Sequence, residues 1–251
     1  MRGWKSRIAT AAPNLITLAA LCAGMTSLRF ALEERFDAAV IALLVAAVLD
    51  GFDGFAARKL SGETLFGAQL DNLSDFLSFG VAPAVFLYVW SLSALGNAGW
   101  ICALLFAAAA GVRLARYGAA WAPALPNQKK AFSGLPTPAA AIAVLLPYSM
   151  SHTASIEAPA VLAGTVVCVA FVAFLMVSRS PVPHTAQIIK SLNGRAPALT
   201  VLLIGWLAAG AALAPFTVLS VTGSAILIFA SASLAAATVA SPLRGDAWLT
   251  D

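Results

Sequence analysis

The chain of 251 residues is 61% hydrophobic and only 10% charged, with a net charge of +4 and a mean hydropathy of +0.89. A soluble domain carries about 25% charged residues, so this composition excludes an ordinary soluble protein and indicates a membrane protein. The basic residues form no tract typical of nucleic-acid binding, so we expect no nucleic-acid partner. The three cysteines form no CxxC pair, and we interpret them as packing residues.

The predicted elements begin with residues 1–13, "MRGWKSRIATAAP", which we expect to form a short amphipathic helix on the membrane surface. Apolar segments follow, most of them close to the roughly 20 residues that cross a bilayer as a helix. Their Ala/Leu/Val runs lack a two-residue alternation, which favours helices over barrel strands. The eight expected spans are 14–32, 36–59, 70–92, 96–117, 136–151, 157–177, 196–214 and 217–239.

These spans predict an all-α polytopic membrane protein whose residues 1–251 form a single domain in the lipid bilayer. Its six-helix core is followed by a C-terminal helix pair at 196–239. With an even number of spans, thirteen Lys and Arg residues fall on the side of both termini and two, Arg29 and Arg35, on the other. The positive-inside rule makes the richer side cytoplasmic, and we expect the protein in the bacterial inner membrane.

The stretch "LDGFDGFAARKLSGETLFGAQLDNLSD", residues 49–75, breaks the apolar pattern. Asp50 and Asp53 share one face of the second span, and Asp71 and Asp75 share one face of the third. A short polar turn joins the two spans, so both acidic faces are expected to meet at the cytoplasmic side. Carboxylates this close repel one another unless cations compensate, and Mg²⁺ or another hard ion is suited to oxygen ligands. The alternative is a structural ion-pair cluster with Arg58 and Lys59.

The spacing D-x₂-D-G-x₂-A-R-x₈-G-x₃-D-x₃-D resembles the signature of the CDP-alcohol phosphatidyltransferases. These membrane enzymes move a phosphatidyl group from a CDP-linked lipid to an alcohol and release CMP. The resemblance implies two divalent ions, Mg²⁺ or Mn²⁺, on Asp50, Asp53, Asp71 and Asp75, and a homodimer. It also implies that Asp75 is the general base. The residues implied for the CDP-lipid are Pro13, Asn14, Gly54, Ala57, Arg58 and Gly67.

The acceptor alcohol has to be inferred from other segments. The stretches "FLSFGVAPA" (76–84), "RLARYGAA" (113–120), "FSGLPTPAAA" (132–141) and "FLMVSRSPVP" (174–183) resemble the phosphatidylserine synthase branch of this family. The implied reaction joins CDP-diacylglycerol and L-serine to give phosphatidylserine and CMP. Two departures, Asn72 in place of the usual serine and Gly118 in place of a frequent asparagine, weaken the acceptor assignment but leave the aspartates intact.

Recognition of serine needs a cation for its carboxylate, and an arginine can pair with a carboxylate through two hydrogen bonds. Arg113 and Arg116 lie three residues apart at the cytoplasmic end of the fourth span, which makes them the candidates. Lys129, Lys130 and Ser78 are weaker candidates for the same substrate. His152 and His184 are interpreted as solvated loop residues.

Two other functions stay open at this point. The acceptor could be glycerol 3-phosphate or an inositol phosphate within the same family. A cation-coupled transporter is a different class, although transporter sites lie near the bilayer midplane rather than at a helix hairpin. No Ser or Cys nucleophile with an adjacent base is evident, so we expect direct attack of the alcohol on phosphorus.

Overall fold

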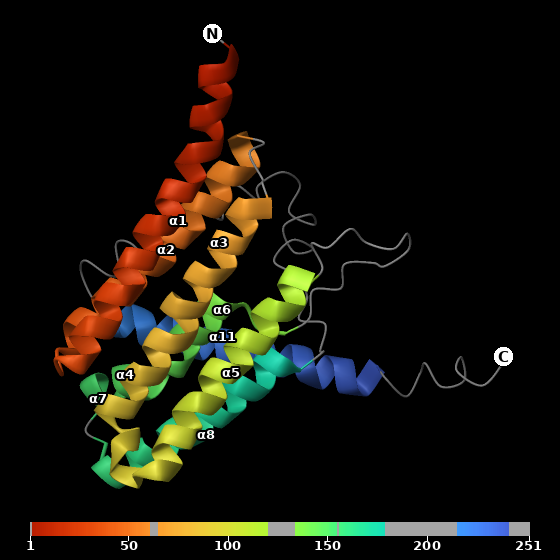
Figure 1. The fold of residues 1–251 in the computed structure, drawn as a ribbon. Helices are drawn as coiled ribbons and strands as arrows, with labels where there is room; N and C mark the ends of the chain where they lie inside the picture. Colours follow the sequence, from red (N-terminus) through yellow and green to blue (C-terminus); the bar gives the residue numbers. More distant parts are fainter. Residues whose placement is uncertain (1, 61–64, 120–133, 155, 179–214, 241–251) are drawn as a thin grey trace.

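A computed structural model describes residues 2–60, 65–119, 134–154, 156–178 and 215–240, and its elements in these ranges are helices (Figure 1). The prediction of an all-α protein is therefore confirmed. The helices are α1 (Arg2–Leu32), α2 (Phe36–Leu60), α3 (Leu65–Asp75), the π-helix η1 (Phe76–Val81), α4 (Ala82–Trp90), the 3₁₀-helix η2 (Leu92–Leu95), α5 (Asn97–Ala119), α6 (Thr137–Val144), α7 (Leu146–Thr153), α8 (Ala158–Val177) and α11 (Pro215–Ala240).

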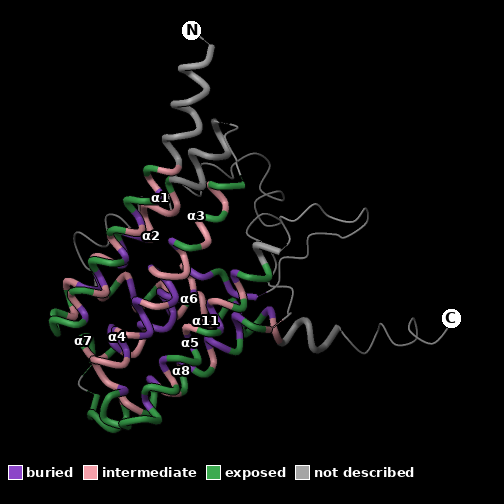
Figure 2. The backbone as a smooth tube through the Cα atoms, in the orientation of Figure 1, coloured by how far each residue is buried: buried purple, intermediate pink, exposed green. Residues whose placement is uncertain are grey.

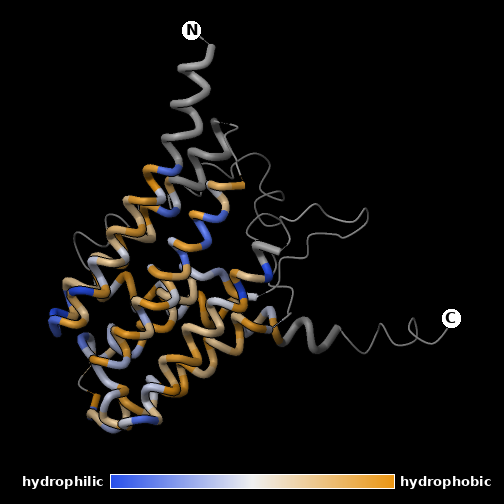
Figure 3. Tube along the Cα trace, viewed as in Figure 1, coloured by the Kyte–Doolittle hydropathy of each residue, from blue (hydrophilic) through white to orange (hydrophobic). Residues whose placement is uncertain are grey.

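Five helical segments in the described ranges are long and apolar enough to cross a membrane. They are Asn14–Leu32, Leu65–Trp90, Asn97–Arg116, Ala158–Val177 and Phe216–Leu234. Figure 3 shows apolar residues over most of α5 and α8. Large apolar side chains are exposed on the apolar helices, for example Ile101 on α5, Val167 on α8 and Ile228 on α11. Helices that expose apolar faces along their length are typical of a polytopic membrane protein.

The predicted span boundaries differ from the observed helices in three places. The N-terminal segment continues directly into the first span as one helix, α1, because the alanine-rich residues before Pro13 are strong helix formers. The third span is predicted to begin at residue 70, but its helix begins at Leu65, because the helix continues beyond its apolar part. The fifth predicted span is divided at Leu145 into α6 and α7, where Pro147 stands in the first turn of α7. The predicted span 196–214 lies outside the described residues.

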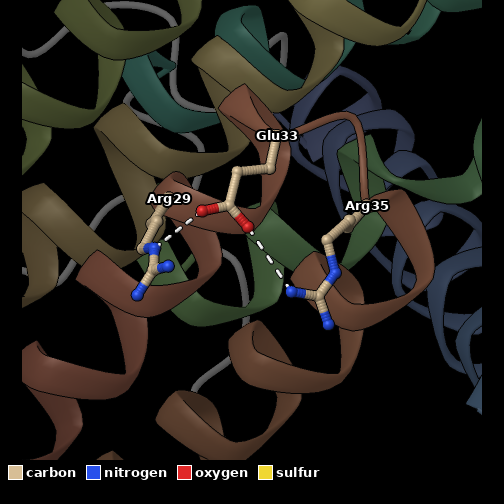
Figure 4. A network of polar contacts seen from close by, with 3 residues as sticks. All are labelled: Arg29, Glu33 and Arg35. Atoms are coloured by element: carbon tan, nitrogen blue, oxygen red, sulfur yellow. Dashed lines mark hydrogen bonds and ion pairs between the residues drawn. The ribbon is translucent and has the colours of Figure 1, made fainter.

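The turn between α1 and α2 holds the two most extensively packed helices together. Glu33 accepts a hydrogen bond from Arg29 at 2.8 Å and lies 3.4 Å from Arg35 (Figure 4). The hydrogen bond from Arg29 lowers the pKa of Glu33 below its ordinary value. Inside the hairpin, Ser27 Oγ donates to the Ala39 carbonyl oxygen at 2.7 Å. Small buried residues such as Ala39 let the two helices approach closely.

The long helical run from Leu65 to Trp90 contains a π-helical turn directly after Asp75. In this turn the Ala82 N–H donates to the carbonyl oxygen of Leu77, five residues earlier. Pro83 follows and has no N–H to donate, which favours a local departure from the regular helix. A π-turn rotates the following residues relative to those before it, and such turns are frequent at functional sites.

The hydrophobic core lies where η1, α4, α5, α6 and α8 meet. Figure 2 shows that buried residues are concentrated in this part. Phe79, Phe86 and Phe106 are among its largest fully buried side chains. At the end of the molecule near the α1–α2 turn, Tyr148 donates a hydrogen bond to Asp37 and packs edge-on against Phe86. His152 stacks on Phe216 with ring centroids 4.4 Å apart, which attaches α11 to α7. Figure 1 shows α11 running across the other helices.

A close contact between two helices lies at Gly24 of α1 and Ser78 of η1. A Cβ atom built on Gly24 would lie 2.7 Å from the Cα atom of Ser78. This backbone approach leaves no room for any side chain at position 24.

We predict that Gly24→Ala destabilises the protein by about 1–3 kcal/mol, because α1 must move away from η1. The measurement is the melting temperature of the purified protein in detergent. Gly164→Ala on α8 is the matched control, since a Cβ there meets nothing within 4 Å. Equal melting temperatures for the two variants would contradict the prediction.

Candidate active site

Three of the four predicted metal-binding aspartates come together in the structure. Asp50 of α2 and Asp71 and Asp75 of α3 each offer a carboxylate oxygen, and these oxygens lie within 4.8 Å of one another. All three residues are half-buried. Two unit charges about 4 Å apart repel by about 4 kcal/mol at an effective dielectric constant of 20, so such a cluster needs compensating positive charge.

The helical repeat of α3 explains why two of these acids face the same way. Gly67, Asp71 and Asp75 follow one another at intervals of four, which places them on one face of the helix. Helix α1 packs against both α2 and α3. Ser74, next to Asp75, donates to the carbonyl oxygen of Thr17 on α1 at 3.3 Å. The α3 register relative to α1 is thereby fixed one residue before the last acid.

Two buried polar atoms beside this cluster have no hydrogen-bond partner in the described structure. They are Oδ1 of Asp75 and Oγ of Ser78. A buried polar atom left without a partner costs about 1–3 kcal/mol, so its persistence calls for an explanation. Oδ1 of Asp75 is well placed for a cation or a substrate proton, whereas Ser78 faces Gly24 of α1.

Arg113 is the predicted arginine that the structure brings to the acids. Its charge acts on Asp75, together with those of Asp50 and Asp71. Its Nη1 donates a hydrogen bond to Oγ1 of Thr137, the first residue of α6. Thr137 is fully buried. It lies in the stretch "FSGLPTPAAA" that carries part of the family resemblance, but no pattern in the sequence singles out this residue.

Arg116, the second predicted arginine, has a different partner. Its Nη1 donates to the carbonyl oxygen of Val177, the last residue of α8, at 2.7 Å. A cation at a helix C-terminus satisfies free carbonyl groups and interacts favourably with the helix dipole. This contact gives Arg116 a structural role at the end of α8.

The other predicted site residues are placed only in part. Asp53, Gly54, Ala57 and Arg58 lie on α2, but their side chains are outside the described part of the structure. Lys129, Lys130 and His184 are also outside the described residues. Pro13 and Asn14 belong to α1, about one turn before Thr17. Their role at the nucleotide and that of Gly67 stay predictions.

The donor set fits a hard divalent cation. Three half-buried carboxylates offer oxygen atoms within one small volume, and Oδ1 of Asp75 lacks a protein partner among the described residues. Oxygen ligands of this kind suit Mg²⁺ and Mn²⁺ rather than softer metals. Asp50, Asp71 and Asp75 are thus the described residues that could hold such an ion.

Comparison with known proteins identifies the family. The family model described as CDP-alcohol phosphatidyltransferase matches residues 10–177, which include the aspartates, Arg113 and Thr137. The chain belongs to the CDP-alcohol phosphatidyltransferase family. The clustered acids therefore lie within the segment that defines this family, and the family assignment made from the motif is confirmed.

Several relatives of this family are named for transfer to serine. The chain is 42% identical to a CDP-diacylglycerol–serine O-phosphatidyltransferase of Mycobacterium leprae over 137 residues, covering 53% of the chain and 45% of the relative. It is 32% identical to the protein of that name from Bacillus subtilis over 173 residues, covering 68% and 89%. An archaetidylserine synthase of Methanothermobacter thermautotrophicus is 32% identical over 142 residues, covering 53% and 56%. The chain spans somewhat less than half the length of the mycobacterial relative.

We predict that Asp71→Asn and Asp75→Asn each weaken Mn²⁺ binding by at least about tenfold, because an amide carries no charge to balance the ion. Binding of Mn²⁺ to the purified protein can be followed by electron paramagnetic resonance without any turnover. Asp37→Asn is the matched control, since Asp37 lies outside the acid cluster and accepts a hydrogen bond from Tyr148. Equal affinity in all three variants would exclude the acid cluster as the metal site.

Proposed function

We propose that this protein transfers the phosphatidyl group of CDP-diacylglycerol to the hydroxyl of L-serine, giving phosphatidylserine and CMP. The observation that carries the proposal is the convergence of Asp50, Asp71 and Asp75, with Arg113 acting on the same cluster. Family membership supports the phosphatidyl transfer, and the names of the relatives support serine as acceptor. The transporter alternative has no support from the family.

The proposed reaction is a direct displacement at phosphorus. The serine hydroxyl oxygen forms a bond to the phosphatidyl phosphorus, the bond from phosphorus to the CMP oxygen breaks, and CMP leaves. Asp75 takes the hydroxyl proton, a task that suits a carboxylate within reach of the substrate. When bound to Asp50, Asp53, Asp71 and Asp75, one or two divalent ions would neutralise charge on the phosphate oxygens.

Arg113 is our candidate for the serine carboxylate. Its charge acts on Asp75, and its guanidinium is held by a hydrogen bond to Thr137. Arg116 is directed to the end of α8 and is a poorer candidate. Lys129, Lys130 and Ser78 are proposed as further contacts of serine, and Arg58 is assigned to the pyrophosphate. Gly54, Ala57 and Gly67 are assigned to the space for the nucleotide.

The remaining assignments follow from charge and family. We propose a homodimer in the bacterial inner membrane, with the site and both termini on the cytoplasmic side. In support, the end of α5, which carries Arg113 and Arg116, and the α1–α2 turn, which carries Arg29 and Arg35, lie at opposite ends of the helices in Figure 1. This separation agrees with the bias of basic residues in the sequence.

The test supplies purified protein with CDP-diacylglycerol, Mg²⁺ or Mn²⁺, and in separate reactions L-serine, glycerol 3-phosphate or an inositol phosphate. Of the three acceptors, we expect only L-serine to support CMP release, with phosphatidylserine as the lipid product. Asp75→Asn is expected to lower the rate by about 10²–10⁴-fold, the usual contribution of a general base. Turnover with a phosphorylated acceptor alone would keep the family reaction and disprove the serine assignment.

We further predict that Arg113→Lys raises the KM for serine about tenfold or more, because lysine cannot form the paired hydrogen bonds of a guanidinium with a carboxylate. The KM for CDP-diacylglycerol is expected to change little. Initial rates over a serine titration measure both constants. An unchanged KM for serine would remove Arg113 from the acceptor site.

A further inference from the structure

The contact between Arg113 and Thr137 joins residues that are 24 positions apart in the sequence. Arg113 approaches from α5, and Thr137 is the first residue of α6. Thr137 is fully buried, whereas Arg113 is half-buried and lies close enough to Asp75 for its charge to act there. The hydroxyl of Thr137 thus lies between the protein core and the charged site.

Thr137 is held firmly by the residues that precede it. Gly134 has a φ of +91°, a backbone conformation that residues with a side chain rarely adopt. A Cβ atom at this position would also lie only 2.5 Å from the carbonyl oxygen of Met176. The Leu135 N–H donates to the carbonyl oxygen of Leu175 at 3.2 Å. Pro136 and Pro138 flank Thr137 and fix the backbone φ on both sides. Thr137 is therefore anchored to the end of α8.

Thr137 offers Arg113 a neutral hydrogen-bond acceptor, and this matters for the charge and the position of the guanidinium. An arginine near three carboxylates is drawn towards the negative charge and has many side-chain conformations available to it. A threonine hydroxyl is a neutral acceptor, so it can take one N–H of the guanidinium without neutralising its charge. Contact with Thr137 therefore orients the guanidinium and leaves it positively charged.

From this geometry we propose that Thr137 is a positioning residue that holds the Arg113 guanidinium in place for the carboxylate of the acceptor alcohol. The inference rests on the proposed function, because it assumes that Arg113 binds that carboxylate. Thr137 itself does not touch the reacting atoms. Its loss should affect the binding of the acceptor and leave the binding of the CDP-lipid unchanged.

The experiment compares Thr137→Val, which keeps the shape and removes the acceptor oxygen, with Thr137→Ser, which keeps the hydroxyl. Thr165→Val is the matched control, since Thr165 is a fully buried threonine whose hydroxyl bonds to Val161 of its own helix. The full-length proteins are purified in detergent with Mn²⁺, and the KM for serine, the KM for CDP-diacylglycerol and kcat are measured. Melting temperatures show whether each variant is folded.

We expect Thr137→Val to raise the KM for serine roughly fivefold to tenfold, the usual effect of losing one hydrogen bond. The KM for CDP-diacylglycerol should stay unchanged, Thr137→Ser should behave as the wild type, and Thr165→Val should not affect either KM. Combining Thr137→Val with Arg113→Lys should raise the KM for serine less than the product of the two single effects, because both changes act on the same contact.

Two results would overturn the inference while leaving the proposed function intact. One is a wild-type KM for serine in Thr137→Val, and the other is an equal rise of both KM values, which indicates a general structural defect. Absence of serine-dependent CMP release by the wild-type protein would instead disprove the proposed function and the inference with it.

Discussion

Mutual repulsion among Asp50, Asp71 and Asp75 is the constraint on which the rest of the structure depends. Their carboxylate oxygens lie within 4.8 Å of one another on two helices that reach into a membrane, where uncompensated charge is costly. The surrounding contacts oppose this repulsion. Ser74 fixes α3 to Thr17 of α1, and Gly24 lets α1 approach the π-turn that follows Asp75. The fold thus holds acids together that would otherwise separate.

The two arginines at the end of α5 show how one helix face serves two purposes. Arg113 binds Thr137 and its charge acts on Asp75, whereas Arg116 binds the carbonyl oxygen of Val177. They are less than one turn apart and of the same residue type, so the difference arises only from what each side chain meets. The end of α8 supplies one partner and the start of α6 the other, and both segments are joined through Leu135 and Leu175.

Much of the acid site could be predicted from the sequence, because aspartates at intervals of three and four on adjacent helices must share a face. The family and the helical class followed from the same pattern and from composition. The role proposed for Thr137 could not be predicted, since it depends on a contact with Arg113 across 24 residues. The π-turn also has no periodic signal, and the helix boundaries at Leu65 and Leu145 depend on polar extensions and a proline that hydropathy does not register.

The anchoring of Gly134 and Leu135 to the last turn of α8 has a consequence for biosynthesis. During translation the acid cluster can form once residues up to Asp75 have entered the membrane, because α1 packs against both α2 and α3. The segment that carries Thr137 finds its hydrogen-bond partner at Leu175 only after about forty further residues have been synthesised. The nascent chain can therefore bring its three clustered acids together before the segment around Thr137 is attached to α8.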